Sequence, residues 1–340
     1  MRKELAKRFE SLVNAAKSIV IITHVDPDGD AIGSSLALFH FLKSIGKEVS
    51  ALVPNGYPDF LAWMPGAETM LIHQKDERLC EEKLKEADLI LCADFNSPDR
   101  MDRLQDAFNS SKATKILIDH HIDRGKFCDL EYHTTAISST SELVYELLSS
   151  FATLPQICPE AAECLFVGIM TDTGSFSYAC NYASTFSTIA ALMECGIDAE
   201  KIHHLVYDTY SEQRLRLLGF CLSDKLQVFE SLHTAFIALS KEDLKRFQYK
   251  TGDTEGVVNY TLGIQGIVFG ALITERSGKI KISLRSKGDF DVNKIARTHF
   301  NGGGHKNASG GDLYCSFEEA VALFKGIIPQ YEEELKKAAK

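Results

Sequence analysis

One histidine and three aspartates stand within seven residues near the start of the chain, in the segment His24-Val25-Asp26-Pro27-Asp28-Gly29-Asp30. Carboxylates this close repel one another, so water or a divalent cation must offset the repulsion. Calcium, magnesium and manganese all accept such oxygen ligands. An aspartate-rich turn that caps the following helix is the alternative that this segment alone leaves open.

A calcium-binding EF-hand does not fit the same segment. A loop of that type starting at Asp26 needs glycine at its sixth position and glutamate at its twelfth. The sequence has Ala31 and Ala37 there, and a strand-like run precedes the segment where a helix is needed. A calcium loop is therefore excluded.

The first half of the chain alternates between strand-like and helix-like segments. Apolar runs of strand length lie at 18–23, 47–53, 88–93 and 115–118. This alternation predicts βαβ units, which form a mostly parallel sheet with helices on both faces. In such a fold, ligands bind beyond the carboxyl ends of the strands, where the strand order reverses.

Histidine and aspartate side chains stand at these predicted strand ends. His24 follows the first run, Asp94 the third, and the triplet Asp119-His120-His121 the fourth; a predicted helix over 158–170 leads to Asp172. Each feature alone is weak, since a histidine near a strand end is more often structural than catalytic. Four segments that deliver such residues to one edge of a sheet predict a functional site.

The number of candidate ligands indicates two metal ions rather than one. Six side chains exceed what one catalytic metal with open positions needs. With Asp94 as the bridging ligand, they divide into His24 and Asp28 for one ion and Asp30, His120 and Asp172 for the other.

A pair of divalent ions predicts phosphoester hydrolysis. Four carboxylates balance two divalent charges, and open metal positions bind an anionic phosphate. Such a pair lowers the pKa of a bridging water and stabilises charge on the attacking and leaving oxygens. Nitrogen and oxygen donors without thiolate suit Mn²⁺ well, while Mg²⁺, Co²⁺ and Fe²⁺ remain open on ligand softness alone.

The second half of the chain predicts a smaller α+β domain. Residues 184–223 have a helical pattern, and the later segments are strands at 227–231, 234–239, 266–276 and 279–286, a hairpin at Ser277-Gly278, a helix at 291–300 and a loop at 301–311. We therefore expect an α/β catalytic domain at 1–190, a helical linker at 191–225 and a substrate-binding domain at 226–340.

Composition and charge exclude several classes of protein. The 340 residues are 45% hydrophobic and 25% charged, which is ordinary for a globular chain. The formal net charge of −10 argues against coating of duplex DNA, because that affinity comes from many lysine and arginine contacts. No apolar run is long enough for a bilayer and no secretory signal is evident, so we expect a cytoplasmic protein without membrane partners.

Nine cysteines are present, and none of them forms a C-x-x-C pair. An odd number of cysteines in a large chain without an export signal is typical of reduced thiols. We therefore expect no disulfide bonds.

The motifs resemble those of the DHH phosphoesterase superfamily. They are H-x-D-x-D-x-D-x-x-G-S at 24–34, Asp94, Asp119-His120-His121 and Asp172. Downstream, the run 302–305 (GGGH), followed by Ala308, Gly310 and Gly311, resembles the signature of a DHHA1 domain. The size and the two-domain layout resemble the stand-alone NrnA-type members, which implies an active cleft between the two domains.

The resemblance also implies roles for individual residues. It makes Asp94, His120, His121 and Asp119 catalytic, with His120 as a metal ligand as well. His121 would face the scissile phosphate and Asp119 would orient its neighbours. Asp26 is expected to support the ligands rather than to bind metal.

In the DHHA1 part, the resemblance implies nucleotide recognition. Backbone N–H groups of Gly302, Gly303 and Gly304 would approach a phosphate, and His305 and Arg285 would complete the pocket. Without the resemblance, 301–311 would be predicted as a flexible loop. The alternative for Arg285 is a charge that keeps an edge strand soluble.

The expected function is therefore that of a Mn²⁺-dependent phosphoesterase. Its substrates would be short single-stranded RNA and linear dinucleotides such as pApA and pGpG, cleaved to 5′-mononucleotides. Removal of the 3′-phosphate from 3′-phosphoadenosine 5′-phosphate is a sibling activity. The alternatives are a manganese inorganic pyrophosphatase, which lacks the GGGH loop, and a nucleotide sensor without turnover. A homodimer is a family-level expectation.

Overall fold

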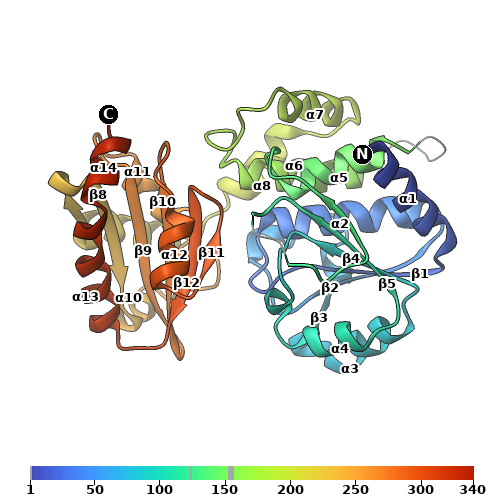
Figure 1. Cartoon of the computed structure of the whole chain (residues 1–340), viewed down its shortest axis with the longest axis horizontal. Coiled ribbons are helices and arrows are strands. Elements are labelled where there is room, and N and C mark those ends of the chain that lie inside the picture. Colours follow the sequence, from blue (N-terminus) through green and yellow to red (C-terminus); the bar gives the residue numbers. More distant parts are fainter. Residues whose placement is uncertain (1, 123–124, 152–156) are drawn as a thin grey trace. The chain divides into compact units, whose positions relative to one another are not determined.

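The chain folds into two compact units, residues 1–209 and 210–340, each of which has its own sheet (Figure 1). A computed structural model describes residues 2–122, 125–151 and 157–340. The predicted helical linker at 191–225 falls across the division between the units. The domain limits given above stay a prediction.

The first unit contains a six-stranded sheet in the order β3-β2-β1-β4-β5-β6. Every neighbouring pair is parallel. The strands are β1 (Ser18–Ile22), β2 (Glu48–Val53), β3 (Leu71–Ile72), β4 (Leu89–Ala93), β5 (Thr114–Asp119) and β6 (Leu130–His133). The strand order reverses between β1 and β4, which is where a ligand site is expected in a doubly wound fold.

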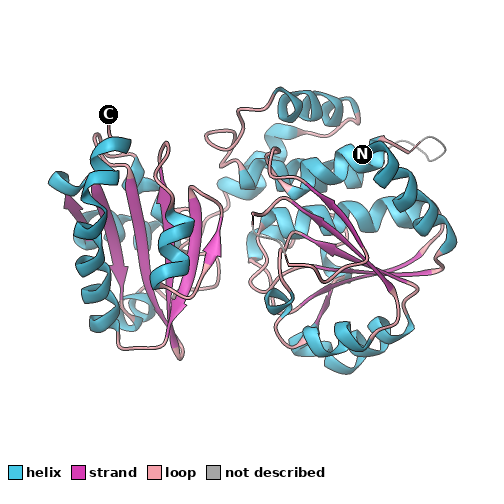
Figure 2. Ribbon diagram, viewed as in Figure 1, coloured by secondary structure: helices cyan, strands magenta, loops and turns pink. Residues whose placement is uncertain are grey.

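Helices cover both faces of this sheet (Figure 2). Because side chains alternate along a strand, Ile19 and Ile21 of β1 join one core, and Val20 and Ile22 join the other. The first core includes residues of α1 (Arg2–Ala15), α2 (Gly29–Ser44), α5 (Thr140–Ser149), α6 (Pro159–Asp172), α7 (Ala183–Glu194) and α8 (Ala199–Tyr207). The second includes residues of α3 (His73–Glu86) and α4 (Leu104–Ser110).

The predicted parallel sheet with helices on both faces is confirmed, and two details differ. The short strands β3 and β6 carry no long apolar run and were not predicted. Asp119 is the last residue of β5, whereas the prediction placed it after the strand.

Glycines allow α2 and α6 to pack closely. A Cβ on Gly33 of α2 would lie 2.6 Å from the carbonyl oxygen of Cys164 in α6. A Cβ on Gly168 of α6 would lie 2.9 Å from Asp30 Oδ1. The two helices therefore approach with backbone against backbone beside the candidate ligands.

The second unit contains a mixed six-stranded sheet in the order β11-β12-β10-β9-β8-β7. The β8–β9 pair is parallel and the other pairs are antiparallel. The strands are β7 (Leu226–Phe229), β8 (Thr234–Leu239), β9 (Phe269–Arg276), β10 (Lys279–Ser286), β11 (Gly303–Gly304) and β12 (Ala308–Leu313).

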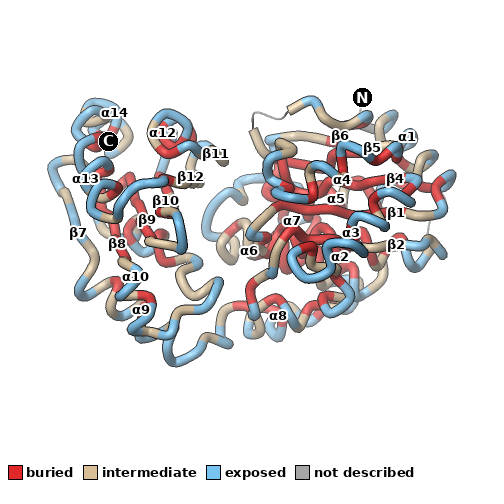
Figure 3. Tube along the Cα trace, turned by 90° about the horizontal axis from the view of Figure 1, so that it is seen from below, coloured by how far each residue is buried: buried red, intermediate tan, exposed pale blue. Residues whose placement is uncertain are grey.

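Helices also cover both faces of the second sheet. The core on one face includes residues of α12 (Val292–His299), α13 (Phe317–Ile327) and α14 (Glu332–Ala338). The core on the other face includes residues of α9 (Glu212–Phe220), a π-helical turn (Cys221–Lys225), α10 (Lys241–Arg246) and α11 (Val257–Leu262). The buried positions of β8, β9 and β10 are drawn in red in Figure 3.

The loop predicted at 301–311 and the edge-strand alternative for Arg285 are both wrong. The glycine-rich run 301–311 is not a flexible loop, because β11 and β12 pair within it as a hairpin. Arg285 does not lie on an edge strand, since β10 pairs with β9 on one side and with β12 on the other. The predicted β9–β10 hairpin at Ser277-Gly278 is confirmed, and Gly278 has a left-handed φ of +81°.

All nine cysteines are free thiols. No helix in the described ranges combines the length and the apolar character that a bilayer crossing requires.

We predict that Gly33→Ala destabilises the first unit. Alanine favours a helix by about 1 kcal/mol over glycine, but the added Cβ would lie 2.6 Å from Cys164 O, a backbone atom that cannot move away alone. We expect a net loss of about 1–3 kcal/mol, measured as a lower melting temperature. Gly219→Ala in α9 is the control, because its Cβ meets nothing within 4 Å. Equal melting temperatures for the two variants would contradict close packing at Gly33.

Candidate metal centre

The candidate ligands lie at the carboxyl edge of the first sheet, beside the reversal of strand order. His24 follows β1, Asp94 follows β4, and His120 follows β5. Asp30 lies in the first turn of α2, and Asp172 is the last residue of α6. The structure thus brings together side chains from four segments that are distant in sequence, 24–30, 94, 120 and 172.

A first group consists of His24, Asp28 and Asp94. Their ligand atoms lie within 4.8 Å of one another. His24 Nε2 is 3.5 Å from Asp94 Oδ2 and 4.0 Å from Asp28 Oδ1. The Nδ1–H of His24 donates to the Val25 carbonyl at 2.8 Å, which directs Nε2 toward the carboxylates.

Asp28 also caps α2. Its Oδ1 accepts hydrogen bonds from the backbone N–H groups of Asp30 and Ala31. The helix-capping alternative is therefore correct for Asp28, which is also one of the candidate ligands. Asp26 exchanges hydrogen bonds with Asn55 through its backbone N–H and its carboxylate. This contact holds the turn in place, at a left-handed φ of +52° for Asp26.

A second group consists of Asp30, His120 and Asp172, again with ligand atoms within 4.8 Å of one another. His120 Nε2 lies 3.8 Å from Asp30 Oδ2 and 3.4 Å from Asp172 Oδ2. Asp30 and His120 are buried, whereas 27% of the Asp172 side chain is exposed. The group is therefore enclosed by protein on the side of the sheet and open to solvent at Asp172.

Asp94 lies between the two groups. Its Oδ2 is 3.5 Å from His24 Nε2, and its Oδ1 is 3.7 Å from His120 Nε2. The residue has a left-handed φ of +67°, and its N–H donates to the Ile118 carbonyl of the neighbouring strand. One carboxylate oxygen thus faces each group, as a bridging ligand requires.

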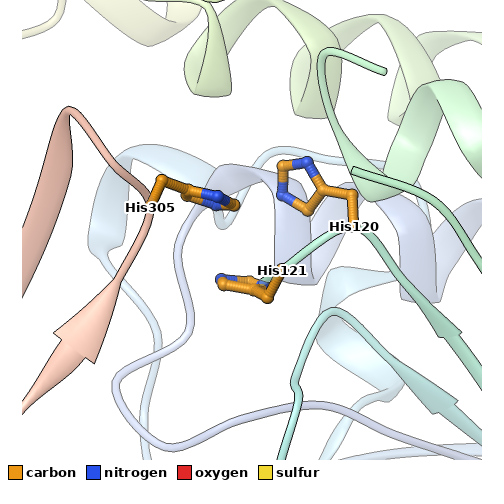
Figure 4. Close-up of side chains that lie close together, drawn as sticks. All are labelled: His120, His121 and His305. Carbon is orange, nitrogen blue, oxygen red and sulfur yellow. The ribbon is translucent and has the colours of Figure 1, made fainter. Parts of the chain in front are cut away.

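His121 and Asp119 form a third arrangement next to Asp94. The Nδ1–H of His121 donates to Asp119 Oδ1 at 2.7 Å, and Nδ1 lies 3.7 Å from Asp94 Oδ1. His133 of β6 donates to the His121 carbonyl at 2.7 Å and lies 3.8 Å from Asp119 Oδ2. Figure 4 shows the imidazoles of His120 and His121, whose ring centroids are 5.0 Å apart at an interplanar angle of 75°.

Burial and mutual repulsion raise the pKa of two carboxylates. Burial, with the charges of Asp30 and Asp28, raises the pKa of Asp94 well above its usual range. Burial also raises the pKa of Asp30 from 3.8 to about 6, against hydrogen bonds from Ser141 and Thr140 that lower it. A divalent cation would remove this penalty, because it favours the ionised form of both groups.

Two other groups, His24 and Asp119, have lowered pKa values. Burial and the charge of Arg100 lower the pKa of His24 to about 4, so its ring is neutral at neutral pH. Burial raises the pKa of Asp119, but the hydrogen bonds and charge of His121, together with the charge of His133, outweigh that effect and leave the pKa below the usual value. His24 thus has a lone pair for a metal, and Asp119 is an anion beside His121.

The donor set fits a pair of divalent cations. The two groups offer imidazole nitrogens and carboxylate oxygens without thiolate, which suits manganese, magnesium and related ions. The six predicted ligands are all present in the two groups. We propose that these six side chains bind the metals.

The first turn of α5 contributes contacts that sequence reasoning missed. The N–H groups of Thr140 and Ser141 donate to Asp30, and the Thr140 hydroxyl donates to Asp94. The signal in the sequence is the run Ser139-Thr140-Ser141-Glu142, which is typical of a helix start.

In the second unit, the predicted glycines form the β11–β12 hairpin. A Cβ on Gly302 would lie 1.9 Å from Gly310 O, and Gly304 has φ of +138°. The N–H of Gly302 donates to the Ala296 carbonyl, and the N–H of His305 donates to that of Ala308. The first amide joins the hairpin to α12 and the second closes the hairpin turn, so amide contacts to a phosphate are proposed for Gly303 and Gly304 only.

Two side chains of α12 lie beside Gly303 and were not predicted. A Cβ on Gly303 would be 3.6 Å from Asn293 Oδ1 and 3.9 Å from Arg297 Nε. Asn293 Oδ1 is buried without a hydrogen-bond partner among the described residues. Arg285 Nε is likewise buried and unpaired, while Arg285 Nη1 donates to the Leu284 carbonyl. Helical spacing of i and i+4 was the only sequence signal for Asn293 and Arg297.

Comparison with family models matches both units. Residues 18–169 match the model described as DHH family, N-terminal domain, and residues 231–330 match the DHHA1 domain. The chain belongs to the DHH family. The resemblance inferred from the motifs is thereby confirmed.

Several relatives cover nearly the whole chain. The bifunctional oligoribonuclease and PAP phosphatase NrnA of Thermus thermophilus is 30% identical over 94% of this chain and 91% of the relative. The protein of the same name from Bacillus subtilis is 28% identical over 91% and 93%. The crystal structure of an exopolyphosphatase-related protein from Bacteroides fragilis has 44% identity, covers 98% of both chains and gives a TM-score of 0.93.

Membership of this family settles the enzyme class. The chain is a phosphoesterase, that is, a hydrolase of phosphate esters, as the sequence predicted.

We predict that stabilisation by added MnCl₂ grows with pH. The raised pKa of Asp30, about 6 instead of 3.8, means that the metal-free fold holds a proton that the unfolded chain releases. The metal-free fold therefore loses stability as the pH rises through this range. Metal binds the ionised carboxylates, so the increase in melting temperature should be larger at pH 8 than at pH 5. Equal increases at both pH values would show that these carboxylates do not bind the metal.

Proposed function

We propose that the protein hydrolyses short single-stranded RNA, including linear dinucleotides, to 5′-mononucleotides, and that it removes the 3′-phosphate from 3′-phosphoadenosine 5′-phosphate. The observation that carries the proposal is the position of Asp94 between two groups of ligands, with one oxygen toward each. The names of the relatives that span both units support these substrates.

One site suits both reactions, because each displaces an alkoxide from a phosphorus linked to a 3′ oxygen. A pair of divalent cations would supply Lewis acidity and an activated water, and the mixed nitrogen and oxygen donors lead us to propose Mn²⁺. In this proposal, side chains of the first unit hold the two cations at a fixed spacing. Asp94 sets the separation of the two groups, and neutral His24 contributes a donor without adding charge.

His121 is the proton donor in this proposal. Its contact with Asp119 through Nδ1 fixes the ring and makes Nε2 the nitrogen that exchanges a proton with the leaving oxygen. Asp119 stays ionised because its pKa is lowered, so it stabilises the protonated imidazole. Asp119 thus orients His121 and balances its charge, as a carboxylate beside a general acid does.

The second unit supplies substrate recognition in this proposal. Gly303 has no side chain on the surface next to Asn293 and Arg297, so a phosphate or a base can approach the backbone there. His305, at the turn of the same hairpin, and Arg285 on β10 are proposed as further contacts.

A substrate comparison tests the proposed function, with Asp94→Asn as the control for contaminating nucleases. With MnCl₂, the wild-type protein should release mononucleotides from pApA and AMP from 3′-phosphoadenosine 5′-phosphate, both measured by chromatography. Asp94→Asn keeps the shape of the side chain but loses its charge, so turnover should fall by at least about 10³-fold. Cleavage of pyrophosphate or polyphosphate alone would overturn the proposal, and tight binding without products would indicate a sensor.

We predict that His305→Ala raises KM for pApA by about tenfold and changes kcat little. The imidazole is proposed to bind substrate equally in the ground and transition states, and loss of such binding raises KM alone. Lys306→Ala is the matched control, because this neighbouring residue pairs with exposed Asp289. A fall in kcat without a change in KM would remove His305 from substrate binding.

A further inference from the structure

The first turn of α5 lies against two of the proposed metal ligands. Ser139 is the N-cap, and its side chain accepts a hydrogen bond from the Glu142 N–H at 3.0 Å. The N–H of Thr140 donates to Asp30 Oδ2 at 2.7 Å, and the N–H of Ser141 donates to Asp30 Oδ1 at 2.8 Å. Both oxygens of one carboxylate are thus held by consecutive amides at the positive end of a helix.

The Thr140 side chain reaches the neighbouring carboxylate. Its hydroxyl donates to Asp94 Oδ1 at 2.8 Å, and both residues are buried. Thr140 is therefore in contact with Asp30 through its backbone and with Asp94 through its side chain. Because Oδ1 is the oxygen that faces His120, this hydrogen bond acts on the side of Asp94 that belongs to the second group.

The turn that carries Thr140 is itself fixed from several directions. Glu142 Oε2 accepts hydrogen bonds from the N–H and hydroxyl of Ser138 and from the hydroxyl of Thr185 in α7. On the side of α6, Gly168 leaves room for Ser141 and Asp30, since a Cβ there would lie 1.9 Å from Ser141 Oγ. These contacts place the Thr140 hydroxyl with little freedom.

We propose that Thr140 is a positioning residue that fixes the rotation of the Asp94 carboxylate, so that the two metals bind as a pair. This inference rests on the proposed two-metal function. A carboxylate oxygen has two lone pairs, and the Thr140 hydroxyl occupies one on Oδ1 and leaves the other toward the second group. Without the hydroxyl, the carboxylate can rotate about its χ2 bond and lose the arrangement with one oxygen toward each metal.

Two substitutions separate this role from simple packing. Thr140→Val keeps the methyl group and the shape but removes the hydroxyl, whereas Thr140→Ser keeps the hydroxyl and removes the methyl group. If Thr140 positions Asp94, valine is the harmful substitution and serine is tolerated. If Thr140 only fills space, the order is reversed.

The primary measurement is Mn²⁺ binding to the metal-free protein, followed by the EPR signal of free Mn²⁺. Wild type should bind two ions. Thr140→Val should weaken binding of the second ion by about tenfold. This factor corresponds to about 1.4 kcal/mol, close to the value of one hydrogen bond to a charged group. Thr140→Ser should remain within about twofold of wild type, and kcat for pApA should follow the same order with KM unchanged.

Thr261→Val controls for the loss of a buried threonine hydroxyl, since Thr261 lies in α11 of the second unit, where its hydroxyl donates to the Val258 carbonyl. It should lower the melting temperature and leave Mn²⁺ binding unchanged. Wild-type Mn²⁺ binding in Thr140→Val, or weaker binding in Thr140→Ser than in Thr140→Val, would overturn the role of Thr140. If wild type binds two Mn²⁺ but cleaves no nucleotide, the proposed function fails while the Thr140 comparison still decides this inference.

Discussion

The structure of the first unit depends on keeping several carboxylates close together in a buried place. Asp30, Asp94 and Asp119 are almost fully buried at the carboxyl edge of one sheet. Buried anions repel and lose hydration, so each needs a partner. The chain supplies helix amides for Asp30, a threonine hydroxyl for Asp94 and an imidazole for Asp119. These partners hold the geometry, but the raised pKa of Asp94 and Asp30 shows that they do not compensate the charge fully.

The parallel sheet solves the problem of bringing these groups together. Strands β1, β4 and β5 are adjacent, so the residues that follow them meet at one edge although nearly a hundred positions separate His24 from His120 in the chain. Helices α2, α5 and α6 then add Asp30, the amides of α5 and Asp172 from the face that they cover. The apolar strands can stay fully buried because the polar groups of the site lie after the strands, except for Asp119, which is the last residue of β5.

Much of this arrangement could be predicted from the sequence. Long apolar runs identified β1, β2, β4 and β5, and parallel topology placed His24, Asp94 and His120 at one edge. Contacts that involve ordinary polar residues could not be predicted in this way. Thr140 and Asn293 belong to types that are common in helix starts and helix faces, so only the fold reveals their neighbours. The hairpin at 301–311 was missed because glycine is depleted in strands, whereas here close approach of β11, β12 and Phe300 requires it.

The glycine contacts between α2 and α6 also bear on the choice of cation. Gly29 precedes Asp30 and packs against Thr171, which precedes Asp172, so these two carboxylates extend from adjoining points of two helices in direct contact. The close contact of Gly29 with Thr171 limits how far the backbones that carry these carboxylates can move apart. Calcium needs bonds of about 2.3–2.6 Å and six to eight ligands, whereas magnesium accepts about 2.1 Å and fewer protein ligands. Under the two-metal proposal, close packing of these two helices would favour small ions over calcium through backbone geometry, in addition to the charge of the ligands.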